Sequence, residues 1–313
     1  MWVKTIRSIQ SMLTALYRFF LYRYFEIRNS WCIWFAIVNR RARALFKKNP
    51  LPLSTEGERI VRSLRESGIA TTTLEALFLN ERAFENMTHW IKTHEPKENM
   101  EGKKKFLREY FDLIPDADLD DIFLKYAIDE RVLAIAQHYL EMWVQLTHYH
   151  LAETLPQEGT PVQSQRWHRD PEEKRILKMF IYLNDVDEEA GPFTYAKKTV
   201  YGQEYGHLFP QKPPEGSYPS EESVISTVPY ELIESMIAPA GTVIFCDTSG
   251  LHFGGRAKSK SRFMFTASYH APSFTEGVRY TVTQKTKEQL KGRGPAVAFA
   301  LSGKRIRTEP LHH

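Results

Sequence analysis

The chain has 313 residues, 42% hydrophobic and 26% charged, which is enough apolar material for a sizeable core. The length suits one large domain with an appendage, or two small domains. A net charge of +4 is too small to indicate nucleic-acid binding without a clustered basic patch. The two cysteines, Cys32 and Cys246, fit no Cys-pair motif, so we expect a cytoplasmic protein without a disulfide framework.

Residues 1–48 are predicted to be a basic, aromatic helical segment. Apolar and aromatic residues alternate with Lys and Arg up to residue 28, a nearly apolar run covers 31–38, and basic residues follow up to residue 48. No run reaches the roughly 18 apolar residues of a spanning helix. Arginines interrupt the apolar part, which argues against a secretory signal. Two interpretations stay open: a helix on an anionic membrane surface, at its cytoplasmic side, or a helical pair packed on the main domain.

Residues 49–140 are predicted to be mainly helical, as the first part of a second domain that covers 49–313. The sequence Asn-Pro-Leu-Pro at 49–52 breaks the chain and is a candidate boundary. Helical spacing of apolar residues then recurs in four segments, separated by a charged loop at 92–102. These segments are 56–66, 73–90, 103–111 and 119–140.

From residue 141 to about 275 the pattern predicts a β-dominated core within an α+β fold. Short β-branched and aromatic runs, separated by Gly and Pro turns, are typical of a sandwich or jelly roll. The expected strands are 143–151, 176–183, 193–195, 235–239, 241–246 and 262–270. A long loop rich in Gly, Pro, Ser and Glu is expected at 202–222. A C-terminal extension covers 276–313, and its last two histidines, His312 and His313, are left out of the site.

A His-X-Asp motif in the β region predicts half of a metal site. His168 and Asp170 are two residues apart, so on a strand both side chains point to one face. Alone, such a pair is commonly a surface turn, but His252 follows 84 positions later, after a turn and a buried strand that can return it to the same place. Two imidazoles and one carboxylate on one side leave positions open on Fe(II) for a cosubstrate and O2.

Arg262 opens the last predicted strand, ten residues after His252, and is expected to neighbour the metal. A guanidinium binds a carboxylate through two hydrogen bonds. A dicarboxylate could therefore chelate the metal at one end and meet Arg262 at the other. Lys178 is the one charge in an otherwise apolar strand, where it shares a face with Phe180 and could reach a cosubstrate or substrate, or extend to water.

An ordered series of motifs resembles the phytanoyl-CoA dioxygenase family over roughly residues 140–275. The motifs are Ser-Gln-Arg-Trp-His-Arg-Asp-Pro at 164–171, the strand and acidic turn at 177–187, Glu-Ala-Gly-Pro-Phe at 189–193, and His252 with Arg262. The resemblance implies a double-stranded β-helix (a cupin-like jelly roll) and an Fe(II)- and 2-oxoglutarate-dependent dioxygenase. It implies that His168, Asp170 and His252 hold iron, that Arg262 pairs with the distal carboxylate of 2-oxoglutarate, and that the Thr194 hydroxyl lies near that carboxylate.

The implied reaction is hydroxylation of an aliphatic C–H bond coupled to decarboxylation of 2-oxoglutarate, and the substrate is left open. Family members often continue after Gly-Pro-Phe with a Pro-Gly-Ser-His turn. Here that turn is Ala-Lys-Lys-Thr at 196–199, which weakens an inference to acyl-CoA. The basic N-terminal segment instead suggests a lipid-linked or acidic sugar, such as 3-deoxy-D-manno-octulosonic acid (Kdo) on a lipid A precursor. Hydroxylation of a small metabolite or an acyl-CoA stays open.

Other chemistry-bearing residues allow different functions. Asp185 and Asp187 resemble the acidic pair of metal-dependent glycosyltransferases, but also fit a solvated turn after a strand. His148 and His150 put two imidazoles on one strand face without a carboxylate. Asp247 could cap a turn or bond a ligand histidine. A barrel that binds without turnover is a further alternative, and the sequence does not determine the oligomeric state.

Overall fold

The computed structural model describes residues 2–79, 81–97, 104, 106–214 and 216–304, with side chains from residue 12 onward. Part of the charged loop predicted at 92–102, together with His312 and His313, lies outside the described residues. The helices are α1 (Trp2–Arg28), the π-helix η1 (Cys32–Val38), α2 (Arg40–Lys48), α3 (Thr55–Ser67), α4 (Leu74–Phe78), α5 (Ala83–Thr93), α6 (Ile122–Ala127), α7 (Glu130–Leu140), the short 3-10 turns η2 (Gln163–Gln165) and η3 (Tyr230–Leu232), α8 (Glu221–Thr227), α9 (Gln284–Gln289) and α10 (Pro295–Ala300).

Two antiparallel sheets lie at the centre of the fold. The strands are β1 (Ile69–Thr73), β2 (Leu107–Glu109), β3 (Gln145–Thr154), β4 (Leu177–Tyr182), β5 (Phe193–Ala196), β6 (Ile233–Ser235), β7 (Thr242–Asp247), β8 (His252–Gly254) and β9 (Arg262–His270). The larger sheet has the order β1-β7-β4-β9-β3-β2, and the smaller sheet has the order β6-β5-β8. The predicted α+β class with a β core after residue 140 is therefore confirmed.

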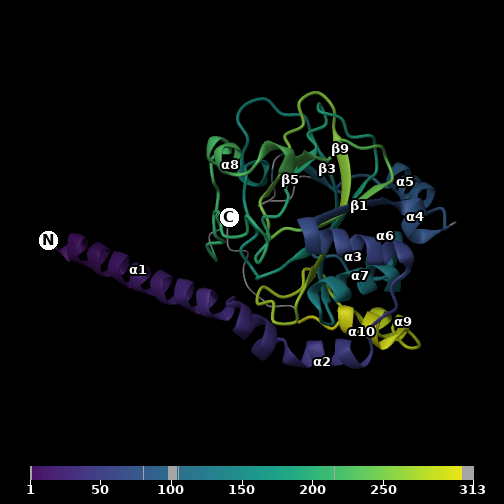
Figure 1. Ribbon diagram of the computed structural model, residues 1–313, viewed down its shortest axis with the longest axis horizontal. Helices are drawn as coiled ribbons and strands as arrows, with labels where there is room; N and C mark the ends of the chain where they lie inside the picture. The colour runs from purple at the N-terminus through teal and green to yellow at the C-terminus, as the bar shows by residue number, and fades with distance from the viewer. Residues whose placement is uncertain (1, 80, 98–103, 105, 215, 305–313) are drawn as a thin grey trace.

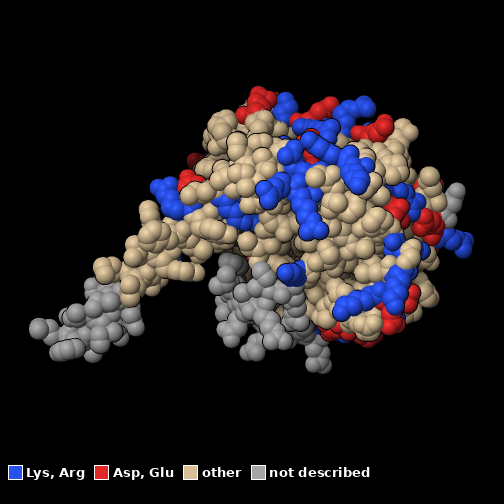
Figure 2. Space-filling view, turned by 90° about the horizontal axis from the view of Figure 1, so that it is seen from below, with Lys and Arg blue, Asp and Glu red and all other residues tan. Residues whose placement is uncertain are grey.

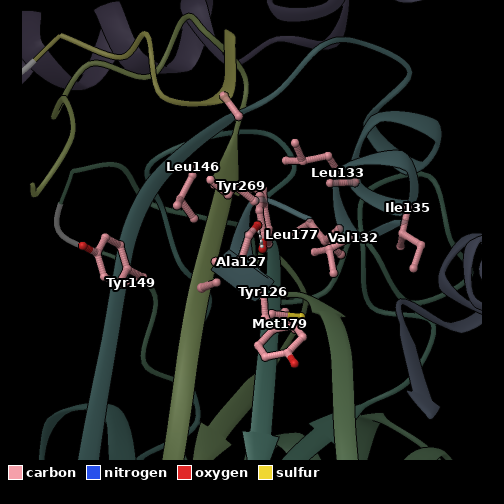
Figure 3. Packing of buried hydrophobic residues seen from close by; sticks show 14 of the residues in the cluster. Tyr126, Ala127, Val132, Leu133, Ile135, Leu146, Tyr149, Leu177, Met179 and Tyr269 are labelled. Carbon is pink, nitrogen blue, oxygen red and sulfur yellow. Dashed lines mark hydrogen bonds between the residues drawn. The ribbon is translucent and has the colours of Figure 1, made fainter. Parts of the chain in front are cut away.

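The larger sheet has two faces of different character because side chains alternate along each strand. One face packs against the helices in a large hydrophobic cluster, where Leu177 and Met179 of β4 and Tyr269 of β9 meet Tyr126 and Leu133 of α6 and α7 (Figure 3). The helices cover this face because their apolar residues recur every three or four positions. The intervening residues of β3, β4 and β9 face the other way and line a cavity.

Three predicted helical segments differ from the structure. The segment 73–90 contains two helices, α4 and α5, and the strand β1 precedes them. The segment 103–111 contains the strand β2 where a helix was predicted. Both strands extend the larger sheet: β1 pairs with β7 and β2 with β3. For β2, the backbone hydrogen bonds of an available sheet edge override weak helical spacing. The strand β1 lies between two predicted helical segments, and its β-branched threonines favour a strand. The segment 119–140 divides into α6 and α7, because Asp121 and Asp129 each cap a new helix.

The N-terminal segment divides into a projecting part and a packed part. The helix α1 extends away from the body, whereas α2 lies along the body (Figure 1). The side chain of Trp34 in η1 is completely buried, and Asn39 bonds to Ser273. At the end of α1, the Arg28 guanidinium meets the buried Glu173 carboxylate at 3.0 Å. None of the described helices is both long and apolar enough to cross a membrane.

Candidate metal centre

His168 and His252 face each other across a pair of backbone hydrogen bonds. The His168 amide donates to the His252 carbonyl at 2.9 Å, and the His252 amide donates to the His168 carbonyl at 3.0 Å. The two ring centroids are 4.2 Å apart. Asp170 follows two residues after His168, and its amide bonds to the Thr248 carbonyl at 2.9 Å. This pairing brings residues 84 positions apart in sequence together, with one ligand atom from each of the three side chains within 4.8 Å of the others.

Backbone carbonyls orient both imidazoles. Nδ1 of His168 bonds to the Arg166 carbonyl at 2.8 Å, and Nδ1 of His252 bonds to the Gly250 carbonyl at 3.0 Å. With Nδ1 as the donor, each Nε2 keeps a free lone pair for a metal ion. Burial, together with the neighbouring His168, lowers the pKa of His252 to about 3. Burial also lowers the pKa of His168, so both rings are neutral at neutral pH, as metal ligands must be.

Lys178 holds the carboxylate of Asp170. Its Nζ lies 2.6 Å from Oδ2, while Oδ1 lies 3.7 Å from Nε2 of His168. Burial alone raises the pKa of Asp170, but the charge of Lys178 and the nearby histidines outweigh burial and keep this pKa well below its ordinary value. Burial by itself lowers the pKa of Lys178, but the carboxylates of Asp170 and Glu172 outweigh burial and raise this pKa above its ordinary value. The pair is therefore ionised, and Lys178 bonds to the side chain of a candidate metal ligand within the cavity wall.

The three side chains line a cavity of about 370 Å³ between the two sheets. The larger sheet contributes its second face, in register: Thr154 lies opposite Arg262, and His150 lies opposite Thr266. The residues of this face that line the cavity are His150, Ala152 and Thr154 of β3, Lys178 and Phe180 of β4, and Arg262, Met264 and Thr266 of β9.

Arg262 is 3% exposed and lines the same cavity. It donates to the Gly191 carbonyl and, at 3.4 Å, to the Thr154 hydroxyl, while its Nε has no hydrogen-bond partner. No carboxylate of the described residues forms an ion pair with it. Burial lowers the pKa of the guanidinium from a very high ordinary value. A buried positive charge beside an open cavity is suited to an anion from outside the chain.

Thr194 lies away from this cavity, contrary to the expected position of its hydroxyl. Thr194 follows Phe193 on β5, and successive side chains of a strand point to opposite faces. Phe193 lines the cavity, whereas the Thr194 hydroxyl bonds to that of Ser235 on β6 at 3.2 Å. The hydroxyl that Arg262 meets comes from Thr154, and a second hydroxyl in the cavity lining comes from Thr266, further along β9; the sequence analysis missed both. Their position became visible only with the pairing of β3 and β9, which puts them on the face of Arg262.

Two buried charged residues support the loops around the triad. Arg169 donates to three carbonyls, those of Thr199, Ser249 and Leu208, at 2.5, 2.6 and 2.8 Å. These bonds tie the long loop after β5 to the His-X-Asp segment. Asp247 accepts hydrogen bonds from the Ser249 amide at 3.0 Å and the Tyr139 hydroxyl at 2.7 Å. Of its two predicted roles, Asp247 therefore caps the turn before His252.

The other predicted pairs have different surroundings. The Asp187 carboxylate accepts bonds from the amides of the following turn and pairs with Lys260, and Asp185 accepts a bond from the Ala240 amide. These contacts are those of a turn. His148 and His150 stack with centroids 4.7 Å apart, and His150 lines the cavity. Over the described ranges, the group of His168, Asp170 and His252 is the one cluster of three whose ligand atoms converge in this way.

Comparisons with known proteins show a shared fold at low sequence identity. No family model and no curated protein matches the chain. Among solved structures, the chain is similar to the epimerase SnoN in complex with Fe3+, alpha-ketoglutarate and nogalamycin RO. The identity is 16% over 70% of this chain and 84% of that chain, with a TM-score of 0.51. The likeness shows the fold of the chain.

Two further solved structures are more distant in fold. HygX from Streptomyces hygroscopicus, with nickel and 2-oxoglutarate bound, is 16% identical over 72% of this chain and 90% of that chain, with a TM-score of 0.47. AviO1 from Streptomyces viridochromogenes Tue57 is 16% identical over 71% of this chain and 98% of that chain, with a TM-score of 0.47.

Proposed function

We propose that the protein is an Fe(II)- and 2-oxoglutarate-dependent dioxygenase that hydroxylates an aliphatic C–H bond. The observation that carries the proposal is a single cavity that contains both the converging triad and the buried Arg262. A donor set of two neutral imidazoles and one carboxylate suits Fe(II) and leaves positions open on the cavity side. Arg262, which lacks an acidic partner among the described residues, suits the distal carboxylate of a dicarboxylate. The fold shared with SnoN agrees with this class.

In this proposal, bound iron and 2-oxoglutarate supply oxygen activation coupled to decarboxylation of the cosubstrate. His168, His252 and Asp170 hold the metal at the wall of the cavity, and Lys178 keeps the carboxylate oriented. Arg262, with the hydroxyls of Thr154 and Thr266, binds and orients the cosubstrate. Apolar side chains beside the triad exclude water from the reacting atoms. These side chains are Phe180, Phe193 and Met264.

The two sheets are proposed to be the halves of a double-stranded β-helix, with residues 49–313 as the catalytic domain and 1–48 as an appended segment. His252 comes from the smaller sheet and Arg262 from the larger one. A site between the two sheets is the arrangement that this fold uses to surround a metal. The antiparallel pairing of both sheets and the cavity between them support this assignment.

The proposed substrate is a lipid-linked or acidic sugar, of which Kdo on a lipid A precursor is one example. The cavity lining beyond the triad combines an aromatic ring with polar and charged groups, which suits the hydroxyls and acidic group of such a sugar. The ring of Tyr218 lies 5.8 Å from that of His168, at an interplanar angle of 16°. The polar side chains nearby are Lys104, Gln163, Ser164, Glu172, Glu276 and Arg279.

Binding of iron and 2-oxoglutarate is the first test. Under anaerobic conditions, the protein with Fe(II) and 2-oxoglutarate is expected to show a visible metal-to-ligand charge-transfer band, which His168→Ala abolishes. His207→Ala is a matched control, because His207 is exposed and does not line the cavity. No band in the parent protein, or an unchanged band in His168→Ala, would refute the proposal.

Turnover separates the proposed reaction from its alternatives. Succinate release that depends on a Kdo-bearing lipid, with one oxygen atom gained by that lipid, is the expected result. The same dependence on an acyl-CoA or a small metabolite would reassign the substrate. Succinate formation with an inverted carbon centre and no added oxygen would indicate an epimerase, the activity named for SnoN. Binding without any turnover would indicate a non-catalytic module. Stabilisation by a nucleotide sugar, and not by 2-oxoglutarate, would favour a glycosyltransferase.

A further inference from the structure

The projecting helix α1 exposes many large apolar side chains. On a helix with about 3.6 residues per turn, those between residues 12 and 27 fall on one broad face. They are Met12, Leu13, Leu16, Tyr17, Phe19, Phe20, Tyr24 and Ile27, each at least half exposed. We call this set the apolar face of α1. A second stripe of the helix is more covered and consists of Leu21, Phe25 and Arg28, which are spaced three or four residues apart. Its last member, Arg28, contacts the body.

The helix is therefore attached to the body through one stripe and presents its apolar face elsewhere. Arg28 fixes the attachment through Glu173, and the packed Trp34 follows six residues later. Isolated exposed apolar residues are ordinary on a protein surface, but a broad apolar face along several helical turns marks an interaction surface, and Arg23 is the one charged residue within its arc. The apolar face lies outside the contacts that stabilise the body.

The charge around α1 identifies the kind of partner. Residues 1–48 contain ten Lys and Arg against one Glu, a net charge of +9, whereas the remaining 265 residues have a net charge of −5. Arg40, Arg41, Lys47 and Lys48 of α2 are exposed. Seen from the side of α2, Lys and Arg gather over the middle of the molecular face, and Asp and Glu lie mainly towards its edge (Figure 2). A second copy that docked through the same segment would bring positive charge against positive charge, so this segment is better suited to an anionic partner.

We propose that α1 lies along an anionic lipid bilayer, with its apolar face in the headgroup and acyl boundary and the basic residues of α2 against lipid phosphates. Phe, Leu and Tyr on one face of a helix, combined with Arg and Lys nearby, are the composition that binds such a boundary. Basic side chains next to the apolar face attract an anionic surface. The structure thus divides the N-terminal segment: η1 and α2 pack on the body, and α1 is free to bind lipid.

Vesicle sedimentation with the full-length chain tests this proposal. The protein is expected to bind vesicles of phosphatidylcholine with phosphatidylglycerol, and to bind pure phosphatidylcholine much more weakly. High salt should weaken binding to the mixed vesicles. The double variant Leu16→Ser/Phe20→Ser should lose at least about tenfold in partition coefficient, because two apolar side chains leave the bilayer. Both side chains are exposed in the free protein, so the thermal midpoint of the variant should equal that of the parent.

A matched pair of single variants gives the control: Tyr17→Ser changes the apolar face, and Tyr230→Ser changes an exposed tyrosine elsewhere. Both tyrosines are exposed, 66% and 79%, but only Tyr17 belongs to the apolar face of α1. Tyr17→Ser should weaken vesicle binding, and Tyr230→Ser should leave it unchanged. Equal binding to neutral and anionic vesicles, or full binding by the double variant, would overturn the proposal. If the parent chain is a dimer that does not bind vesicles, and the double variant is a monomer, then the partner of the apolar face is a second copy of the chain. Vesicle binding is measured without metal, so its outcome is independent of the proposed reaction.

Discussion

Arg262 differs from an ordinary buried arginine because no carboxylate of the described chain neutralises it. Its Nη groups meet a carbonyl and a hydroxyl, and its Nε has no partner. Burying an uncompensated charge is costly, so the position is most stable when an anion enters the cavity. A substitution of Arg262 can therefore test the proposed cosubstrate binding separately from metal binding.

Arg262→Lys should weaken 2-oxoglutarate binding about tenfold or more, because an ammonium cannot form the two parallel hydrogen bonds of a guanidinium. Metal affinity should change little, since Arg262 is no ligand. Titrating the charge-transfer absorbance with 2-oxoglutarate, and separately the metal-free protein with Co(II), measures the two effects. Arg256→Lys is the control, because Arg256 bonds to the Gln157 carbonyl outside the cavity lining. Unchanged 2-oxoglutarate affinity in Arg262→Lys would remove its proposed role.

His270 makes the stability of the metal-free protein depend on pH. Burial, together with the charge of Lys178, lowers its pKa to about 3 from an ordinary 6.5. Between these values the unfolded chain binds a proton that the folded chain does not. The contribution of His270 is therefore fully present above pH 6.5 and is lost as the pH falls towards 3, by up to about 1.4 kcal/mol per pH unit.

His270→Gln should flatten this dependence. Gln can still bond to Thr147, the present partner of His270 at 2.7 Å, but does not titrate. Urea unfolding of the metal-free parent and variant at several pH values below 6.5 measures the difference. Parallel curves for the two proteins would show that His270 does not titrate differently on folding.

At the scale of elements, the joint between α1 and the body depends on one buried ion pair. Glu173 is fully buried and accepts hydrogen bonds from Arg28, Ser273 and the Ala271 amide. Burial raises the pKa of Glu173 and outweighs the lowering effect of Arg28, so that this pKa is about 7. Arg28 also donates to the Ser273 carbonyl. This cluster links the end of α1 to the segment after Asp170, the proposed metal ligand, and to the loop after β9.

Arg28→Met should lower the free energy of unfolding by about 3 kcal/mol, because the buried Glu173 side chain, the Asn29 side chain and the Ser273 carbonyl all lose their donor. Arg28→Met/Glu173→Gln should recover part of the loss, since the second change replaces the carboxyl that lost its partner with an uncharged amide that can still accept from Ser273 and the Ala271 amide. Urea unfolding at neutral pH measures both. Arg23→Met serves as the control: Arg23 pairs with Glu26 on the exposed side of the same helix and should change nothing measurable. Equal effects of Arg28→Met and Arg23→Met would contradict the importance of the joint.

At the scale of the whole molecule, the N-terminal segment combines two environments within 48 residues. The side chains of 12–20 are exposed, whereas Trp34 and Ala42 belong to the main hydrophobic cluster. The stability of the body therefore depends on η1 and α2 and not on the first part of α1. This division gives a prediction for truncation.

Deleting residues 1–20 should leave the unfolding midpoint unchanged, because the described side chains among them, 12–20, are exposed and belong to none of the hydrophobic clusters. Deleting residues 1–48 should cost about 3 kcal/mol or more, because the site of Trp34 loses its largest side chain. Chemical unfolding of both truncated chains beside the parent measures the effect. A strong loss of stability in the shorter deletion, or none in the longer one, would show that the boundary between the packed and the projecting part lies elsewhere.

The sequence by itself determined the residue types of the site and the general class of the fold. The His-X-Asp spacing, the later histidine and the arginine after it are local patterns, and strand alternation predicts which residues share a face. The change from helical to strand patterns near residue 140 is also local, because it depends on side-chain spacing along the chain. These features required no knowledge of which strands pair.

Only the tertiary structure decided which separate strands became neighbours. The pairing of His168 with His252, the position of Thr154 opposite Arg262, and the turning of Thr194 towards Ser235 all depend on register between distant segments. The strands β1 and β2 formed because sheet edges were available to them, β2 against its weak helical spacing. Local patterns cannot contain this information, since the hydrogen bonds and packing that select a register exist only after the chain has folded.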